Sequence, residues 1–464
     1  MSDTAVEAPP ADAPAPKGVH DMTRGSVRGH VVRMMTFVLA GLAIQTLYGL
    51  VDIYWVGRLG KEAVAAVSLS SNLMFVSLAV TQTLSVGTVA LVSQAAGRKE
   101  HDTVQRLFNQ SQSLSTFAGL LFLGVLMALR RTYAEGLGGD PATAELAATF
   151  LLYFIPSLAL QFTMVGLGSA LRGIGDMKPG LIAQTASVLL NMVLAPFLVF
   201  GWIGGHPLGV AGAAIATLVS TIAAVVGLMV YLTRGKTFLR LHAPSWRPDL
   251  EVWGRMLGIG LPAGAEFLLM SIIMGAIYVV TRPFGPQAQA GFGIGSRVMQ
   301  VGFMPAVAIS FASAAVVGQN FGSREFGRVR EVLRESGKLV VGFMLVFTAI
   351  CQLAPGAFVH VFSSEPAVVE VGADYLRMVS YNYVASGFIF LIAGIFQGIG
   401  NTWPSLMASF SRALAFVLPV LWLSRQPGFE MHRIWQLSVA SVTFQFVLCA
   451  LLLQRELRIK APAA

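Results

Sequence analysis

A single carboxylate inside an apolar, membrane-length segment is the feature of this sequence with the clearest chemical potential. Asp52 lies in the segment from residue 31 to 58, in which apolar residues predominate. Gly41, Gln45 and Tyr48 precede it at helical spacing, so these four residues form one polar stripe along a helix. An ionisable side chain in hydrocarbon costs at least about 2.5 kcal/mol on insertion scales, so its presence predicts a role in transport. The alternative is a hydrated residue near the outer end of the helix.

A second polar stripe is predicted in the segment from 179 to 201. Asn191 shares a helical face there with Gln184 and Ser187. Together with Asp52, this carboxamide could hold a proton or a sodium ion, because neighbouring donors and charges tune the proton affinity of a carboxylate. Gln161, in a neighbouring segment, is a weaker member of the same group. A hydrogen bond that only joins two helices is the alternative role for Asn191.

The second half of the chain carries its own candidate charges. Glu266 lies one turn after Pro262, and Arg297 lies in the next apolar segment. We expect these two charges to meet near mid-membrane, either as a structural ion pair or with Glu266 as a cation-binding group. Tyr381 and Asn382 could form a wall of the site that binds an aromatic, amphipathic ligand.

The composition indicates an integral membrane protein. Of the 464 residues, 55% are hydrophobic and only 12% are charged, too few to cover a soluble surface of this size. The net charge of +9 does not indicate a nucleic-acid partner, because Lys and Arg concentrate in short connections between apolar stretches. Cys351 and Cys449 lack metal-binding or disulfide spacing, so no metal site is predicted.

The apolar stretches predict an all-α membrane fold with twelve transmembrane helices. Each stretch has about 20 residues or more, enough to span about 30 Å of hydrocarbon as a helix. The predicted segments are 33–57, 66–93, 105–129, 143–171, 179–201, 209–233, 252–281, 287–318, 330–354, 367–397, 403–424 and 432–454. Lys and Arg are about threefold more frequent on one side, which places both termini in the cytoplasm.

An internal repeat divides the chain into two parallel six-helix halves around a central cleft. Residues 89–100 align with 314–325, and residues 172–179 align with 397–404, both at an offset of 225. An even number of crossings per half relates the repeats by an axis along the membrane normal. The predicted organisation is a disordered tail (1–23), an N-lobe (24–233), a cytoplasmic linker (234–251), a C-lobe (252–456) and a C-terminal tail (457–464).

The missing motifs exclude several enzyme classes. The sequence has no GxxxxGK[ST] loop for ATP and no HExxH metalloprotease motif. We therefore expect no catalytic residues and no cofactor, with an H⁺ or Na⁺ gradient as the energy source.

Several stretches together resemble the multidrug and toxic compound extrusion (MATE) family of secondary transporters. The resemblance covers about residues 24 to 456. The matching stretches are LVDIYWVGRLG followed by AVAAVSL (50–69), ALRGIGDMKP (170–179), GVAGAAIAT (209–217), IGLPAG (259–264) and GFGIGSRVMQVGFMPAVAISFASAAVVGQNFG (291–322).

This resemblance implies export of amphipathic, often cationic compounds by alternating access, in exchange for H⁺ or Na⁺. It also implies that Asp52 matches the family's coupling carboxylate and that Asn191 matches the Asn of a fifth-helix NxxxDP pattern. The sequence departs from the family at Ala195, where that pattern has Asp, and at Phe37, where many bacterial members have a proline. Glu266 lies closer to its helix proline than the better-known family glutamates.

The sequence thus predicts a monomeric, multi-pass inner-membrane antiporter whose partners are amphipathic small molecules and the lipid bilayer. The proton is preferred as the coupling ion, since one carboxylate carries a proton whereas a hard cation such as Na⁺ needs several oxygen ligands. The alternatives are a Na⁺-coupled exporter of the same fold, a flippase for lipid-linked substrates, and a membrane interaction protein whose buried charges only pack helices.

Overall fold

The computed structural model describes residues 20–137, 140–202, 205–235, 237–241 and 246–460. These residues form helices and contain no strand, and twelve spans are long and apolar enough to cross a membrane, which confirms the predicted fold class. The helices are α1 (Val27–Gly57), α2 (Lys61–Gly97), α3 (His101–Leu137), α4 (Pro141–Gly173), α5 (Lys178–Phe200), α6 (Gly209–Thr233), α7 (Leu250–Thr281), η2 (Arg282–Phe284), α8 (Pro286–Gly322), α9 (Phe326–Leu353), α10 (Pro355–His360), α11 (Pro366–Val379), η3 (Ser380–Asn382), α12 (Tyr383–Ile399), α13 (Trp403–Leu423) and α14 (Met431–Lys460).

The backbone repeats itself at the predicted offset. Lys99 and Arg324, which lie 225 residues apart, are the described non-glycine residues with positive φ, at 61° and 63°. Each ends the turn that follows its helix, α2 or α8, in the left-handed conformation. Gly175 and Gly400, at the same offset, have φ angles of 85° and 80°. The repeat is therefore a repeat of local structure as well as of sequence.

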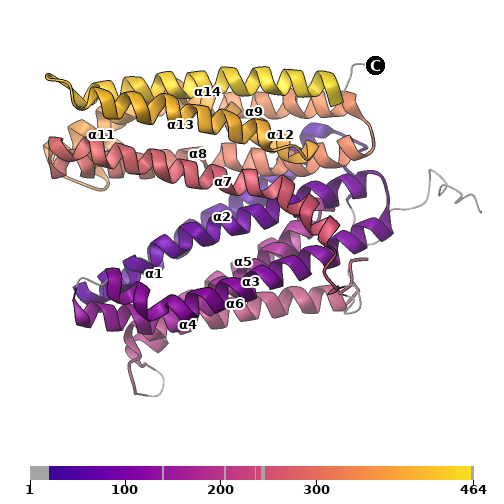
Figure 1. The fold of residues 1–464 in the computed structure, drawn as a ribbon, viewed down its shortest axis with the longest axis horizontal. Coiled ribbons are helices and arrows are strands. Elements are labelled where there is room, and N and C mark those ends of the chain that lie inside the picture. Colours follow the sequence, from indigo (N-terminus) through magenta and orange to yellow (C-terminus); the bar gives the residue numbers. More distant parts are fainter. Residues whose placement is uncertain (1–19, 138–139, 203–204, 236, 242–245, 461–464) are drawn as a thin grey trace, which may run out of the picture.

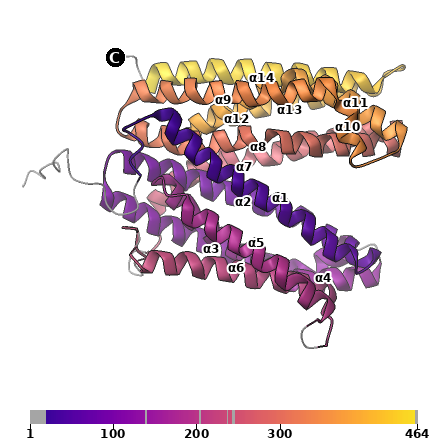
Figure 2. The same cartoon turned by 180° about the vertical axis from the view of Figure 1, so that it is seen from behind.

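The two halves form two helical bundles, here called the N-lobe (α1–α6) and the C-lobe (α7–α14). The described chain begins and ends at one end of the bundles, here called the terminal side. Figures 1 and 2 show the lobes approaching each other on this side and diverging towards the opposite side. The hydrogen bonds that join α2 to α12 and α8 to α4 also lie towards the terminal side.

Helices α1 and α7 each pack against both lobes, as Figure 2 shows for α1 and Figure 1 for α7. Val31, near the start of α1, belongs to a core formed mainly by C-lobe helices, whereas Val56 near its end packs in an N-lobe core. Trp253, near the start of α7, packs in an N-lobe core, whereas Ile277 near its end lies in the C-lobe core. Each helix therefore crosses from one lobe to the other along its length.

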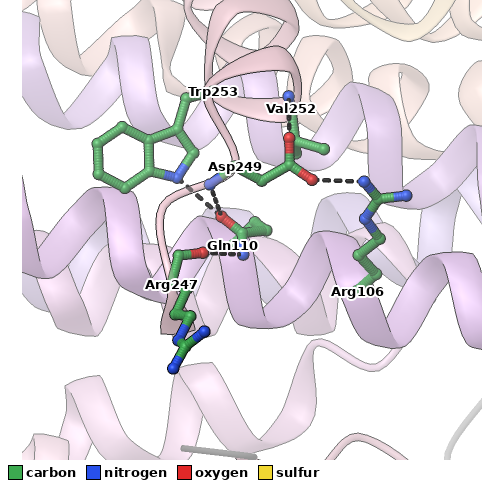
Figure 3. Close-up of polar contacts among 6 residues, drawn as sticks. All are labelled: Arg106, Gln110, Arg247, Asp249, Val252 and Trp253. Atoms are coloured by element: carbon green, nitrogen blue, oxygen red, sulfur yellow. Dashed lines mark hydrogen bonds and ion pairs between the residues drawn. The ribbon is translucent and has the colours of Figure 1, made fainter. Parts of the chain in front are cut away.

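The start of α7 is fixed to α3 by a polar cluster (Figure 3). Gln110 Oε1 accepts hydrogen bonds from the Asp249 amide and from Trp253 Nε1, both at 3.0 Å. Gln110 Nε2 donates to the Arg247 carbonyl oxygen at 2.9 Å, and Arg106 pairs with the Asp249 carboxylate. The hydrogen bond from Arg106 lowers the pKa of Asp249 below its ordinary value.

The chain preceding α1 differs from the expected disordered tail. Residues 1–19 lie outside the described residues, but Met22 is fully buried and its amide donates to Gln319 Oε1 at 2.9 Å. Backbone hydrogen bonds join residues 20–26 to the rest of the protein, so the part of the predicted tail next to α1 is ordered. At the other end α14 continues to Lys460, into the predicted C-terminal tail, and residues 461–464 lie outside the described residues.

Candidate ion-coupling site in the N-lobe

Two residues of the α1 polar stripe, Gly41 and Tyr48, lie against other helices of the N-lobe. A Cβ atom added at Gly41 would lie 3.3 Å from Gln184 Oε1, so this part of α1 is directly against α5. Further along, the Tyr48 hydroxyl lies 3.3 Å from Thr217 Oγ1 on α6. Asp52 follows Tyr48 by one helical turn, about 6 Å, along the same face. The backbone of Asp52 belongs to α1, but its side chain lies outside the described residues.

Thr217 joins three helices of this lobe. Asn191 on α5 is only 4% exposed, and its Nδ2 donates to Thr217 Oγ1 at 3.1 Å. The Thr217 hydroxyl donates in turn to the Ala213 carbonyl oxygen at 3.1 Å. Tyr48 and Asn191, two of the predicted site residues, thus meet at one hydroxyl group. Among the described residues, Asn191 Oδ1 has no hydrogen bond, which leaves an acceptor able to bind a carboxyl O–H or a cation.

Thr217 is a functional candidate that polar spacing alone did not indicate. It is a single small hydroxyl at the end of an Ala-rich run, and threonine in a membrane helix commonly bonds only its own backbone. The one available signal was its place at the end of GVAGAAIAT, a stretch that carries the resemblance to a transporter family.

Replacing Thr217 by Val should lower the free energy of unfolding by about 1 to 3 kcal/mol. Valine keeps the shape of the side chain but leaves the buried Asn191 amide unpaired. Thr221→Val is the matched control, because Thr221 donates only to the Thr217 carbonyl oxygen, at 2.8 Å within α6. Thermal melts of the purified variants in detergent measure the difference. Equal destabilisation by the two substitutions would contradict the role of Thr217 as a junction.

The remaining N-lobe candidates lie apart from this junction. Gln45 is exposed on α1 and Gln161 is half-buried on α4, and neither forms a hydrogen bond to another described residue.

In the C-lobe, Tyr381 is 67% exposed, so its side chain is free to contact a ligand. Asn382 is buried, donates to the Val439 carbonyl oxygen and accepts from Thr443 Oγ1 at 3.3 Å. Its carboxamide is therefore occupied in joining η3 to α14.

Glu266 and Arg297 do not meet, in contrast to the expectation. The Glu266 side chain points into the C-lobe, where its carboxylate lies beside the Ser405 hydroxyl of α13. Its Oε1 is buried without a hydrogen bond among the described residues. Arg297 is exposed on α8 and takes part in no described ion pair. The two helices are neighbours in sequence, but their rotations direct these side chains to different places.

A chain of polar side chains continues inside the C-lobe beyond Glu266. Gln445 on α14 donates to Ser409 Oγ at 3.0 Å and accepts from Arg412 Nη1 at 3.2 Å. Ser409 lies one turn after Ser405 on α13, so these groups follow the same helix face from Glu266 towards Arg412. The C-lobe thus holds a carboxylate, Glu266, in a polar surrounding that is separate from the N-lobe junction.

Comparison with known sequences identifies the family. The MatE family model matches residues 38–197 and 262–423, one stretch in each lobe. Over 89% of this chain and 91% of the relative, the sequence is 27% identical to a probable multidrug resistance protein, YoeA, of Bacillus subtilis. It is 26% identical to the probable multidrug resistance protein NorM of Thermotoga maritima, over 89% of this chain and 87% of that protein.

Solved structures agree with the fold. A multidrug resistance MATE family transporter of the MOP superfamily, in an outward-facing conformation, superposes with a TM-score of 0.88 at 23% identity, over 96% of this chain and 98% of that one. A MOP superfamily transporter from Pyrococcus furiosus superposes with a TM-score of 0.87 at 23% identity, over 95% and 98% of the two chains. With twelve spans, two repeats and a family model matched in both lobes, this chain belongs to the MatE family of membrane transporters.

Proposed function

We propose that this protein is a proton-coupled antiporter that exports amphipathic, cationic compounds across the cell inner membrane by alternating access. The observation that carries this proposal is the position of Asp52, a carboxylate in a membrane-spanning helix, one turn beyond the Tyr48, Thr217 and Asn191 junction. Relatives named as multidrug resistance proteins support the class of cargo.

The chemistry of the junction favours a proton over sodium. One carboxylate suffices to carry a proton, and Asn191 Oδ1 is an acceptor for the O–H of a protonated carboxyl group. A sodium site would need several oxygen ligands, as hard cations do. Ala195, one turn after Asn191 and 1% exposed, adds none.

The arrangement of the lobes supports the proposed direction of transport, which is outward. The excess of Lys and Arg on the terminal side supports a cytoplasmic position for this side. The lobes approach each other on this side and diverge on the other, as expected of a state that releases its cargo outward (Figure 1). Binding of a proton to Asp52 from outside would favour that state, and the ligand and the proton shift the populations only as far as their affinities for the two states differ.

Ion-gradient experiments on reconstituted vesicles test the choice of ion. We expect ethidium to accumulate when the vesicle lumen is acidic relative to the medium, and this accumulation to stop when the pH gradient is collapsed. An imposed sodium gradient at equal pH should leave ethidium uptake at the level of protein-free vesicles. Uptake that follows the sodium gradient and ignores a collapsed pH gradient would overturn proton coupling while leaving transport intact.

A further inference from the structure

Two glutamines tie the lobes together on the terminal side. Gln94 on α2 donates from Nε2 to the carbonyl oxygen of Gly398 on α12 at 2.9 Å. Gln319 on α8 donates from Nε2 to the carbonyl oxygen of Gly173 on α4 at 3.2 Å. Donors and acceptors are both 225 residues apart, so the internal repeat relates the two bonds. Each bond runs from one lobe to the other.

The acceptors are carbonyl groups at helix ends. Gly173 is the last residue of α4, and Gly398 is next to last in α12. Carbonyl oxygens in the last turn of a helix have no partner within their own helix and need one from outside. Each glutamine therefore caps a helix of the opposite lobe, and separation of the lobes would leave both the donor and the acceptor without this bond.

The backbones of α2 and α8 touch beside these glutamines. A Cβ atom added at Gly97 would lie 1.9 Å from the Gln319 carbonyl oxygen, and one added at Gly322 would lie 2.1 Å from the Gln94 carbonyl oxygen. Only glycine allows so close an approach. The glutamine bonds are thus short links across a contact that is already closed, and their loss needs only a small separation of the helices.

The segment before α1 strengthens only one of the two links. Met22 donates from its amide to Gln319 Oε1 at 2.9 Å, and its carbonyl oxygen accepts from Asn320 Nδ2 at 3.1 Å. Arg328 donates to the Met22 and Gly25 carbonyl oxygens at 3.3 and 3.0 Å. On the N-lobe side, the His20 amide donates to the Ile174 carbonyl oxygen at 2.9 Å. This segment therefore bridges the lobes at Gln319.

The repeat supplies no such support at Gln94. The positions equivalent to Asn320 and Arg328 are Ala95 and Thr103, whose side chains cannot clamp a peptide carbonyl in the same way. The segment before α7, the equivalent of the segment before α1, binds instead to Gln110 on α3 (Figure 3). The two links have equivalent glutamines, but only the Gln319 link is supported by the segment before α1.

We propose that Gln94 and Gln319 are positioning residues that hold the transport pathway closed on the terminal side, and that residues 20–26 act as a latch on the Gln319 link alone. The pathway opens on this side when both glutamine bonds break and the segment withdraws from Gln319. This inference goes beyond the proposed function, because it concerns which contacts set access to the pathway and does not depend on the ion that is exchanged.

Side-specific labelling of a cysteine tests the proposal. Ser93 is fully buried where α2 meets Gly318 of α8, so Ser93→Cys, in a protein with Cys351→Ala and Cys449→Ala, reports opening of the terminal side. We expect Gln94→Met to raise the rate of maleimide labelling by about fivefold to tenfold, the effect of losing one hydrogen bond. Gln319→Met should raise the rate further, because it also removes the acceptor for the Met22 amide. Methionine keeps the length of the side chain and removes the donor.

Gln105→Met is the matched control. Gln105 lies on the same side and also bonds a backbone segment, at Arg240, but this bond joins α3 to the connection between α6 and α7 and does not join the two lobes. Its replacement should leave the labelling rate unchanged. An equal rise in all three variants, or no rise in either Gln94→Met or Gln319→Met, would overturn the proposal. If a methionine variant does not fold, Gln94→Glu and Gln319→Glu remove the same Nε2 donors and should also raise the labelling rate. Gln319→Glu keeps an acceptor for the Met22 amide, so it tests the link to Gly173 alone.

A double-mutant comparison tests the latch. Asn320→Ala loosens the segment at Met22, so its effect on the labelling rate should multiply with that of Gln94→Met, the independent link. Its effect should be less than multiplicative with Gln319→Met, because both substitutions release the same segment. If the effects on the labelling rate multiply in both double mutants, the segment is not coupled to Gln319. That result would refute the asymmetric latch.

Discussion

Replacing Asp52 by Asn is expected to reduce gradient-driven efflux to the background rate of vesicles without protein. Asparagine keeps the size and hydrogen-bonding capacity of the side chain but cannot take up or release a proton. Because the Tyr48, Thr217 and Asn191 junction stays intact, the variant should still fold and bind cationic dye. Ethidium efflux from reconstituted vesicles under an imposed pH gradient measures the effect.

Asp249→Asn is the control for this substitution. Asp249 lies outside the membrane spans, and the hydrogen bond from Arg106 lowers the pKa of its carboxyl group, so it stays ionised between pH 5 and 8 and cannot exchange a proton there. Its contribution to stability is present above the ordinary Asp pKa and is lost only as the pH falls through the lowered value. Efflux by Asp249→Asn should match the wild type. Efflux retained by Asp52→Asn would move the coupling to another carboxylate.

Replacing Gly260 by Ala is expected to have a large effect on folding. A Cβ atom added there would lie 1.9 Å from the Thr83 carbonyl oxygen, because the backbones of α7 and α2 are in direct contact. Overpacking at such a contact costs about 1 to 3 kcal/mol or more, since neither backbone can move aside freely. We expect a lowered melting temperature or loss of folded protein, measured by thermal denaturation and size-exclusion chromatography.

Gly258→Ala tests whether this effect is local. Gly258 lies two residues earlier on the same helix and has no heavy atom within 4 Å of an added Cβ. Alanine there should be neutral or stabilising, by up to about 1 kcal/mol, through its higher helix propensity. If Gly260→Ala were as stable as Gly258→Ala, the close contact between α2 and α7 would not hold the lobes together.

The sequence predicted the large-scale architecture because that architecture depends on composition and repetition. The twelve predicted apolar stretches correspond to twelve membrane-length spans. The offset of 225 residues relates the matched turns at Lys99 and Arg324. The alignment that paired Gln94 with Gln319 also paired the carbonyl groups that they bind. A repeat in sequence can therefore predict a repeated contact, although it does not show that the contact joins the two lobes.

The details of the site depend on helix rotation and packing partners, which the sequence does not encode locally. Glu266 and Arg297 lie on successive spans, yet Glu266 lies beside Ser405 inside the C-lobe and Arg297 is exposed. Thr217 is inconspicuous until Tyr48 and Asn191 are placed beside it. The crossing of α1 and α7 was hidden for the same reason, since both helices are apolar over most of their surface and do not show which lobe each part contacts.

Proton release on substrate binding is the most direct test of the central claim, that Asp52 is the site of the exchanged proton. Ethidium added to purified protein in a weakly buffered, pH-sensitive dye solution should release protons from the wild type and from Glu266→Gln. Asp52→Asn should bind ethidium without releasing protons. Release retained by Asp52→Asn and lost in Glu266→Gln would place the exchanged proton in the C-lobe and contradict the account, and ethidium binding without release by any of the three proteins would contradict proton coupling altogether.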